Sequence, residues 1–565
     1  MSEHNFDEQV DFIVVGSGGG SMCAALRMRE SGKSVLILEK TDLVGGTTSR
    51  SGGVMWIPNN RFMRESGVAD STEAALTYLE ATAGQSEDAP GTSEAKRRAY
   101  VEQGPEMVDF LVDKGVKLKR VSRWPDYYDE RPGGSVPGRT VIAEIFNVNE
   151  LPKQWRSRLR PNFMKIAAYH EEGFNIALMK SSWRGKATML KVGLRVALAK
   201  LTGKSLTPAG GALQGRMLKA SLAAGVDIRV NCAVKSFLSA GDRVAGVVAD
   251  CDGQEKRIGA KLGVLVNAGG FAQNQAMRDQ YIPHTSTQWT ATAPGDTGEM
   301  IQELIAMGAA FGQMNERVGN QMSIPPGCEN LDGQGVDLGN VAGQMNLSKP
   351  GAILVDQTGQ RYMNECGSYM EFCQNILKRH ESVPAIPSWY VFDSTHINNY
   401  MLSGTMPGPD KPQAWYDNGY LHKADSIEAL ASQINIDPSA LSATVERFNA
   451  GAREGRDDEF HRGDRAYDNW LGDHYREPSN TLSPLDSGPF YAIPMLPGDV
   501  GTYGGVVVDE FARVLREDGT PMAGLYATGT TTASIMGRYY PGAGSSIGPS
   551  FVYGYIAAKH AAGLF

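Results

Sequence analysis

The stretch that decides the fold is DFIVVGSGGGS at residues 11–21, followed by SVLILEK at residues 34–40. The apolar run 12–15 is typical of a buried parallel strand, and the glycines after it permit a tight turn and close approach of the backbone to a pyrophosphate. A helix predicted over 20–29 would direct its N-terminal amides at that pyrophosphate. Glu39 ends a second strand, where a carboxylate can accept hydrogen bonds from the ribose hydroxyls of an adenosine. The pattern predicts a doubly wound, Rossmann-like α/β domain that binds a dinucleotide.

A second glycine-rich loop follows directly, with the sequence GGTTSRSGG at residues 45–53. A site that binds only a nicotinamide dinucleotide does not need such a loop after the strand that ends at Glu39. Its backbone N–H groups and small hydroxyls suit a ligand that lies deeper than the adenosine. The loop therefore favours FAD over NAD, and the alternative is a flexible surface loop.

Later segments are expected to return to the same crevice. Apolar strands are predicted at 226–230, 263–266 and 524–527, and a helix over 547–562 closes the chain. Together with the two N-terminal loops they give the expected cofactor-binding residues, which are Gly16, Ser17, Gly18, Ser21, Glu39, Lys40, Gly46, Thr47, Thr48, Ser49, Ser51, Gly52, Gly53, Val234, Ala268, Gly269, Gly529, Ser546 and Ile547.

The FAD-binding domain is predicted to be discontinuous. It would consist of residues 1–274 and 484–565, because strands of the nucleotide-binding type occur in both segments. Residues 275–483 would form an inserted α+β domain that caps the flavin and supplies the substrate site. Helices are predicted within it over 297–307 and 438–448.

Composition excludes several classes of protein. The chain has 565 residues, of which 41% are hydrophobic and 21% charged, and a formal net charge of -8. This is ordinary for a globular protein, and the negative charge argues against general nucleic-acid binding. The polar N-terminus and the absence of a long apolar window predict a cytoplasmic protein without a signal peptide or membrane span. The six cysteines and nine histidines are dispersed, which predicts reduced thiols and no protein-bound metal.

Residues 151–204 differ from the rest of the chain. They carry twelve Lys or Arg against two Glu, with aromatic residues interleaved. Within them, residues 183–200 have the pattern of a basic amphipathic helix, which can lie on an anionic membrane surface with its apolar face buried. The alternative is a solvated basic face packed on its own domain, so peripheral membrane contact is one of two expectations.

Three tyrosine-rich clusters supply the candidate reacting groups. They are WPDYYDE at 124–130, RYMNECGSYMEF at 361–372 and GRYYPGAGSSIGP at 537–549. A single tyrosine is usually a packed side chain with a hydrogen-bonded hydroxyl. Tyr540 differs, because it precedes a glycine-rich turn and the helix whose N-terminus should face the flavin.

These clusters resemble those of a known family, the 3-ketosteroid Δ1-dehydrogenases, within the fumarate-reductase-like flavoproteins. The resemblance covers nearly the whole chain. Its most specific motifs are SRSGGVMWIPNN at 49–60, DYY at 126–128 followed by PGG at 132–134, FHRGD at 460–464, GPFYA at 488–492 and MGRYYPGAG at 536–544.

The resemblance implies a role for each catalytic residue. Tyr369 would be the base that removes the C2 proton, with Tyr127 as its helper, while a hydride passes from C1 to flavin N5. Tyr540 and the backbone N–H of Gly544 would hold the 3-keto oxygen, as an oxyanion hole does. A free tyrosine has a pKa of about 10, so Tyr369 would need help toward the phenolate. Either Tyr127 or Tyr128 could face the site, since neighbours on an extended chain point in opposite directions, and Tyr127 is favoured.

The resemblance also implies the cofactor's attachment and the substrate. The fingerprint loop lacks the histidine that carries covalent flavin in succinate dehydrogenases, so FAD should be held without a covalent bond. Residues 497–505 lack the histidine of the fumarate reductases. The expected activity is introduction of a 1,2 double bond into ring A of a 3-ketosteroid, with a quinone or similar external electron acceptor. The alternatives are a 3-ketosteroid Δ4-(5α)-dehydrogenase, a dicarboxylate oxidoreductase, and a flavoprotein used as a binding or redox-sensing module.

Overall fold

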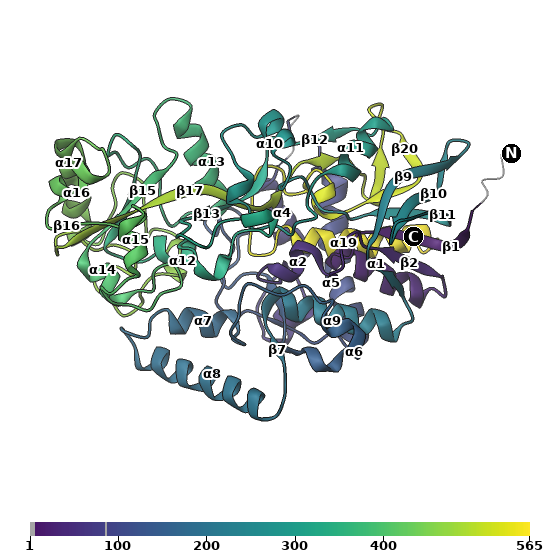
Figure 1. Cartoon of the computed structure of the whole chain (residues 1–565), viewed down its shortest axis with the longest axis horizontal. Coiled ribbons are helices and arrows are strands. Elements are labelled where there is room, and N and C mark those ends of the chain that lie inside the picture. The colour runs from purple at the N-terminus through teal and green to yellow at the C-terminus, as the bar shows by residue number, and fades with distance from the viewer. Residues whose placement is uncertain (1–5, 85–87) are drawn as a thin grey trace.

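Two sheet-based units lie side by side along the long axis of the molecule, and helix α8 (Trp183–Leu201) projects beneath them (Figure 1). The computed structural model describes residues 6–84 and 88–565, so residues 1–5 of the polar N-terminus lie outside it. The first unit contains both β1 (Glu8–Val15) and the closing helix α19 (Ile547–Ala561). In the described part of the chain, no helix is long and apolar enough to cross a bilayer.

The first unit is built on an eight-stranded sheet with the order β19-β20-β10-β11-β1-β2-β8, in which β9 also pairs with β10. Its other strands are β2 (Val35–Leu38), β8 (Asp227–Arg229), β9 (Cys232–Ala240), β10 (Arg243–Cys251), β11 (Gln254–Val266), β19 (Arg513–Leu515) and β20 (Pro521–Ala527). β1 pairs in parallel with both β2 and β11, and its last four residues are buried. The predicted α/β fold with a parallel core is therefore confirmed.

The glycines after β1 divide between two tasks. Gly16 adopts a φ of +89°, which the turn requires and which other residues rarely adopt. A Cβ at Gly19 would lie 2.0 Å from the Phe551 ring, and one at Gly20 would lie 2.2 Å from the Ser550 carbonyl oxygen. These two glycines therefore let α1 (Gly19–Glu30) pack directly against α19.

The second unit is built on a five-stranded sheet with the order β13-β17-β15-β14, in which β16 also pairs with β17. Its elements include β13 (Arg317–Met322), β14 (Ala352–Val355), α13 (Tyr369–His380), β15 (Ser388–Phe392), β16 (His422–Ala424), α17 (Pro438–Arg453) and β17 (Phe490–Thr502). The strands that pair with β17 lie between residues 317 and 424. The sheet therefore continues past the expected domain limit at residue 484.

Helix packing bears on the other expected limit, which is the start of the inserted domain at residue 275. Helix α11 (Glu299–Ala306) was expected in the inserted unit, yet Met300 and Leu304 pack into the core formed by the first sheet. The strands of the second sheet come from residues 317 to 502. Hydrophobic patterning identifies strands and helices, but it does not reveal which sheet a strand joins or which core a helix faces.

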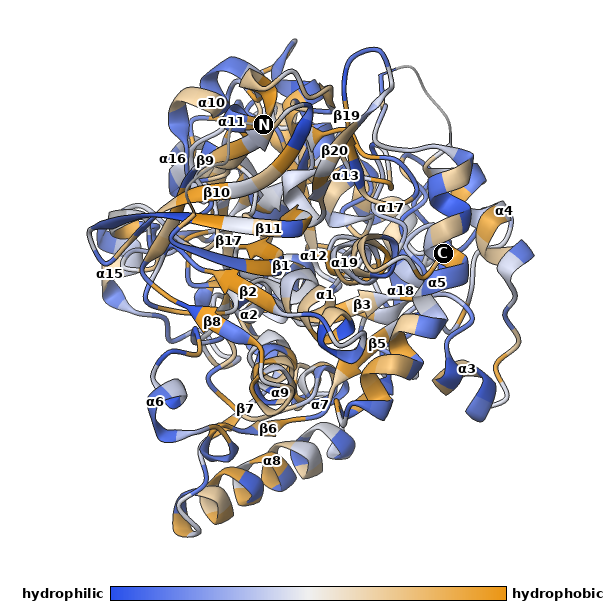
Figure 2. Ribbon diagram, turned by 90° about the vertical axis from the view of Figure 1, so that its right-hand side faces the viewer, coloured by the Kyte–Doolittle hydropathy of each residue, from blue (hydrophilic) through white to orange (hydrophobic). Residues whose placement is uncertain are grey.

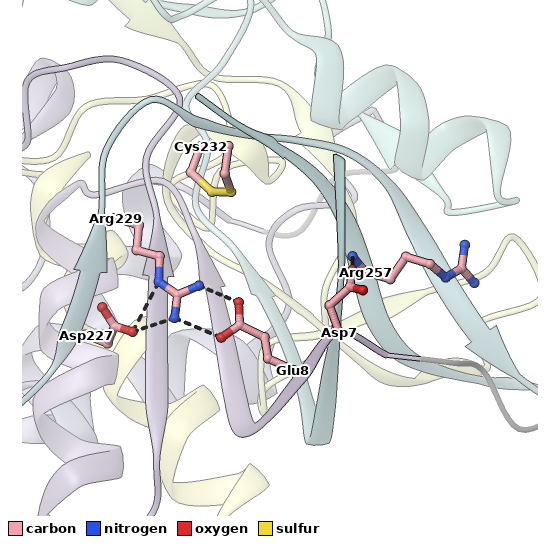
Figure 3. Close-up of a disulfide and its surroundings, with 7 residues drawn as sticks. Asp7, Glu8, Asp227, Arg229, Cys232 and Arg257 are labelled. Carbon is pink, nitrogen blue, oxygen red and sulfur yellow. Dashed lines mark hydrogen bonds and ion pairs between the residues drawn. A yellow bond between two sulfur atoms is a disulfide. The ribbon is translucent and has the colours of Figure 1, made fainter. Parts of the chain in front are cut away.

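One pair of cysteines corrects the expectation that all six are free. Cys232 and Cys251 form a disulfide (Figure 3), and the other four cysteines are unbonded. The two residues are directly opposite in the antiparallel β9–β10 pair. Their juxtaposition depends on hairpin register, which their separation of 19 residues did not reveal. Next to the disulfide, Arg229 of β8 pairs with Glu8 of β1, which ties two strands of the sheet together.

Candidate active site

A cavity of about 850 Å³ lies where the parallel strands of the first sheet end, and it reaches from Glu39 to Tyr540. This is the crevice at which doubly wound folds bind their ligands. Most of the predicted cofactor-binding residues line it, namely Gly16, Ser17, Gly18, Glu39, Lys40, Gly46, Thr47, Thr48, Ser51, Gly52, Val234, Ala268, Gly269, Gly529, Ser546 and Ile547.

Three predicted residues lie behind the cavity wall instead. The Ser49 hydroxyl donates a hydrogen bond of 2.5 Å to the Arg160 carbonyl oxygen. The Ser21 hydroxyl hydrogen-bonds to the side-chain amide of Asn267 at 2.9 Å. A Cβ at Gly53 would lie 2.4 Å from the backbone of Ala209, so this glycine permits a close approach of two chain segments. These residues hold the walls of the cavity in place.

The Glu39 carboxylate is fixed at the end of β2. Its Oε2 accepts hydrogen bonds from the backbone N–H (3.1 Å) and hydroxyl (2.5 Å) of Ser17. Its Oε1 accepts hydrogen bonds of 2.9 Å from the backbone N–H and hydroxyl of Thr41. A carboxylate held in this position suits the ribose of an adenosine.

The N-terminus of α1 also fits the expected cofactor. Gly18 is the N-cap, it lines the cavity, and no side chain caps the helix there. Exposed N-terminal amides form an anion site, which suits a pyrophosphate. Among the described residues that line the cavity, none is histidine and the single cysteine, Cys232, is in the disulfide. The helix N-terminus and the Glu39 carboxylate therefore fit the two ends of an adenine dinucleotide's ribose–pyrophosphate portion.

Three phenols from distant segments meet in one wall of the cavity. Tyr369 begins α13, Tyr127 comes from the 124–130 loop, and Tyr540 comes from the turn before α19. The ring centroid of Tyr369 lies 5.3 Å from that of Tyr127 and 4.9 Å from that of Tyr540. Tyr127 lines the cavity, whereas the ring of its neighbour Tyr128 packs against Tyr539. The side chain favoured from the sequence is thus the one that faces the cavity.

Burial sets the protonation state of these phenols. It raises the pKa of Tyr369 well above the ordinary phenol value, and the neighbouring phenols Tyr127 and Tyr540 add to the effect. Burial also raises the pKa of Tyr540, although hydrogen bonds with Ser546, with Tyr369 and with the backbone N–H of Gly544 oppose it. Tyr540 is therefore a neutral hydroxyl near pH 7, and it can donate a hydrogen bond to a ligand oxygen.

The turn that carries Tyr540 is tightly constrained. Gly544 adopts a φ of +103°, and a Cβ there would lie 2.5 Å from the Trp56 backbone nitrogen. The Pro541 carbonyl oxygen accepts hydrogen bonds from the backbone N–H of Tyr127 (2.9 Å) and from the Tyr78 hydroxyl (2.6 Å). These contacts fix the Tyr127 loop to the Tyr540 turn. Gly544 itself is not among the residues that line the cavity, whereas its neighbour Ala543 is.

Two notable residues were missed from the sequence. Asp296 lines the cavity, and burial raises its pKa to about 6 while the hydrogen bond from the Gly270 N–H opposes the shift. Tyr467 packs with its ring centroid 4.3 Å from that of Tyr127. Nothing in its local sequence marks Asp296 as a site residue. Tyr467 follows the FHRGD motif by three residues, and this proximity was the available signal.

The fold and the cavity define an FAD-dependent oxidoreductase, and comparison with known proteins supports this class. The sequence profile of the family described as FAD binding domain matches residues 11–547. The 3-oxosteroid 1-dehydrogenase of Mycobacterium tuberculosis (strain ATCC 25618 / H37Rv) is 36% identical over 573 residues, which cover 98% of each protein. The 4-oxocyclohexanecarboxylate 2-dehydrogenase of Sinomonas cyclohexanicum is 33% identical over 570 residues, covering 98% of this chain and 93% of that protein.

A solved structure is similar over the same length. The 3-ketosteroid delta1-dehydrogenase from Sterolibacterium denitrificans, in complex with 1,4-androstadiene-3,17-dione, superposes with a TM-score of 0.90 at 34% identity. The match covers 98% of this chain and 100% of that one. The chain therefore belongs to the FAD-binding family of the fumarate reductase group, in the branch that contains the 3-oxosteroid 1-dehydrogenases. The predictions of the family and of FAD as cofactor are confirmed.

Proposed function

We propose that this protein is a 3-ketosteroid Δ1-dehydrogenase, which introduces a 1,2 double bond into ring A. The observation that carries the proposal is the meeting of Tyr369, Tyr127 and Tyr540 in the wall of the cavity that also holds the nucleotide-binding loops. The related dehydrogenases named above act on ring ketones, and the steroid enzymes among them match over the full chain.

Each phenol has a role that its position supports. A hydroxyl at Tyr540 and the N–H of Gly544 donate hydrogen bonds to the 3-keto oxygen, so negative charge that develops there is stabilised. This makes the C2 proton more acidic, and Tyr369 accepts that proton when its hydroxyl is in the phenolate form. Tyr127, whose ring centroid lies 5.3 Å from that of Tyr369, would donate a hydrogen bond to the Tyr369 oxygen when that oxygen is charged. FAD, when bound, supplies the acceptor for the hydride that leaves C1.

A smaller ring ketone is the second candidate substrate, because the cyclohexanecarboxylate dehydrogenase is 33% identical to this chain. The same chemistry, loss of hydrogen next to a ketone, would apply. A dicarboxylate is disfavoured by charge. The described cationic residues that line the cavity include Lys40 and Arg160, which lie at its Glu39 end, away from the phenols. Two carboxylates would need such partners at the reacting centre.

One anaerobic experiment separates these candidates. The purified yellow protein is mixed with androst-4-ene-3,17-dione, with 5α-androstane-3,17-dione, with 4-oxocyclohexanecarboxylate or with succinate, and flavin bleaching and the steroid product are measured. We expect bleaching with the first compound and formation of its 1,4-diene. A 4-ene product from the 5α-steroid alone would instead indicate the Δ4 activity. Absence of bleaching by any 3-ketosteroid would overturn the proposal.

We also propose peripheral contact of the 151–204 segment with an anionic membrane surface, through helix α8. Figure 2 shows α8 at the edge of the molecule with hydrophobic and hydrophilic residues alternating along it. Its outward apolar side chains are 43–83% exposed, and they are Trp183, Met189, Leu190, Leu194, Leu198 and Leu201. Exposed apolar residues at this spacing form one helix face.

Charge supports an anionic lipid surface as the partner of α8. The segment carries twelve Lys or Arg against two Glu in a chain whose formal net charge is -8. Helix α8 is attached to α7 (His170–Ile176), because Arg195 of α8 donates two hydrogen bonds of 2.6 Å to the Glu172 carboxylate. A fixed apolar face surrounded by cations is the arrangement that binds anionic bilayers. A quinone or similar acceptor dissolved in that bilayer is our proposal for the external oxidant of the reduced flavin.

A further inference from the structure

A second cavity, of about 470 Å³, lies between helix α7, helix α8 and the chain that follows α18 (Ala466–Trp470), and we call it the Lys349 cavity. Among the described residues, none lines both this cavity and the active-site cavity. Trp470 lines the Lys349 cavity and stacks on Trp124, which lines the active-site cavity, with ring centroids 4.8 Å apart. Two stacked indoles therefore stand between the two cavities.

Positive charge is in excess around the Lys349 cavity. In the described parts of the chain, four of its lining cations make no ion pair, namely Lys119, Arg123, Arg184 and Lys349. A fifth, Lys191, pairs with Glu172, whose carboxylate also pairs with Arg195. The other lining acid, Glu171, accepts hydrogen bonds from the backbone N–H (2.8 Å) and hydroxyl (2.5 Å) of Ser122. Cations that converge on one cavity without counter-charges favour an anionic ligand.

Lys349 places a buried ammonium group in the wall of this cavity. Its side chain is part of a residue that is 3% exposed, and its Nζ donates hydrogen bonds to the carbonyl oxygens of Leu471 and Gly472. An ammonium group has three donors, so these two bonds leave one for a ligand. Burial lowers the pKa of Lys349 to about 8, while the nearby Asp473 opposes the shift, so the group is charged near pH 7. A bound anion would compensate this buried charge.

The Lys349 cavity adjoins the exposed apolar face of α8. Arg184, Thr188 and Lys191 line the cavity from α8, and their spacing places them along one side of the helix. That side lies roughly a quarter turn around the helix axis from the exposed side chains of Leu190 and Leu194. A molecule with an anionic head and apolar chains can therefore occupy the cavity and the apolar face together.

We propose that the Lys349 cavity binds the phosphate of an anionic phospholipid headgroup, and that the acyl chains of this lipid lie over the apolar face of α8. The inference rests on the proposed contact of α8 with an anionic membrane surface, and it assigns a discrete lipid site to that contact. Guanidinium and ammonium groups are the side chains that bind phosphate most strongly. One lipid held in this way would fix the orientation of α8 on the bilayer, which the diffuse attraction of a basic segment does not do.

The lipid site can be tested without a bilayer. The FAD-loaded protein is titrated by calorimetry with dihexanoylphosphatidylglycerol below its micelle concentration, so that only lipid monomers are present. We expect saturable binding of one lipid. Dihexanoylphosphatidylcholine has the same chains but no net charge, and it should bind at least about tenfold more weakly. Glycerol 3-phosphate should also bind more weakly because it lacks the chains. Equally tight binding of glycerol 3-phosphate would show that the ligand is a free phosphate ester and would overturn the lipid assignment.

Two matched variants locate the site. Arg184→Gln and Lys200→Gln each remove one positive charge from an exposed position on α8, but only Arg184 lines the Lys349 cavity. We expect Arg184→Gln to weaken binding of the monomeric phosphatidylglycerol about fivefold, as for loss of one exposed charge pair, and Lys200→Gln to bind as the wild type does. Lys349→Gln should lose at least about tenfold. Because the Lys349 ammonium also holds two carbonyl groups, the comparison of Arg184→Gln with Lys200→Gln decides the question.

The outcomes separate this inference from the membrane contact on which it rests. Absence of saturable binding by the wild type would overturn the lipid site, as would equal weakening in Arg184→Gln and Lys200→Gln. A wild type that binds phosphatidylglycerol vesicles but no monomeric lipid would overturn the lipid site and leave the contact of α8 with the membrane intact. Binding of monomeric lipid without binding to vesicles would support the lipid site and count against the membrane contact.

Discussion

Tyr127 meets Tyr369 edge to face, with ring centroids 5.3 Å apart and an interplanar angle of 81°. Tyr127 is also fixed through its backbone N–H, which donates to the Pro541 carbonyl oxygen at 2.9 Å. Tyr127 therefore contacts both the proposed base, Tyr369, and the turn that carries Tyr540. A change at either phenol acts on one connected unit.

Replacement of Tyr369 by Phe removes the proposed base and leaves the ring. Because general-base catalysis contributes about 100- to 10,000-fold, we expect kcat to fall by that factor. Steroid affinity should change little, since the Tyr540 hydroxyl and the Gly544 N–H remain. Rapid-mixing kinetics and equilibrium titration with the 1,4-diene product measure the two quantities separately. Loss of binding with normal turnover would reverse the roles assigned to Tyr369 and Tyr540.

Gly544→Ala should damage both the fold and the ketone site. The backbone φ of +103° is strained for alanine, and the new Cβ would lie 2.5 Å from the Trp56 nitrogen. Strain and overpacking together predict a loss of about 2–4 kcal/mol in the free energy of unfolding. Gly193→Ala is the control, because nothing lies within 4 Å of that Cβ on helix α8. The control should gain about 0.5–1 kcal/mol, and equal stability of the two variants would contradict the argument.

Several features of the site could be predicted from the sequence because they depend on local geometry. The turn at Gly16 and the carboxylate at Glu39 each depend on a few neighbouring residues. Local geometry left the choice between Tyr127 and Tyr128 open, and the resemblance favoured Tyr127. The roles of Gly19 and Gly20 could not be predicted, since they face Phe551 and Ser550 some 530 residues later. A three-glycine run was interpreted as a ligand loop, whereas two of its members serve helix packing.

Several of the features that were missed depend on which segments pair or pack with one another. β17 joins the second sheet through partners at residues 317–424, and no local signal reveals that choice. Tyr467 reaches the site because Asp129, far earlier in the chain, holds α18 by its N-terminus. The Cys232–Cys251 pair depends on the register of one hairpin. In each case the sequence specifies the element but not the partner.

The disulfide should add measurable stability. Cys232 and Cys251 are 19 residues apart, and a loop of that size corresponds to about 3 kcal/mol. We expect Cys251→Ser to lower the free energy of unfolding by that amount, while Cys328→Ser, at an unbonded and partly exposed cysteine, has little effect. The Cys232 N–H also donates to the Glu39 carbonyl oxygen at 2.9 Å. Because Glu39 is expected to bind the ribose of FAD, the Cys251→Ser variant should bind FAD less tightly. Thiol titration of the denatured wild type should give four thiols, and six would refute the pairing.

Leu190→Glu should detach the protein from anionic vesicles. The Leu190 side chain is 65% exposed on α8, and burying it in a bilayer interface is worth about 1.5–3 kcal/mol. Loss of that burial, together with a new negative charge among cations, predicts at least about a tenfold weaker partition into phosphatidylglycerol vesicles.

Leu331→Glu is the matched control, because Leu331 is 60% exposed but lies outside the 151–204 segment. Sedimentation at low and high salt measures the partition, and salt should weaken wild-type binding because it screens the attraction of the basic segment. If the wild type stays in the supernatant at low salt, or if both variants bind as it does, α8 does not dock on membranes and its apolar face serves another partner.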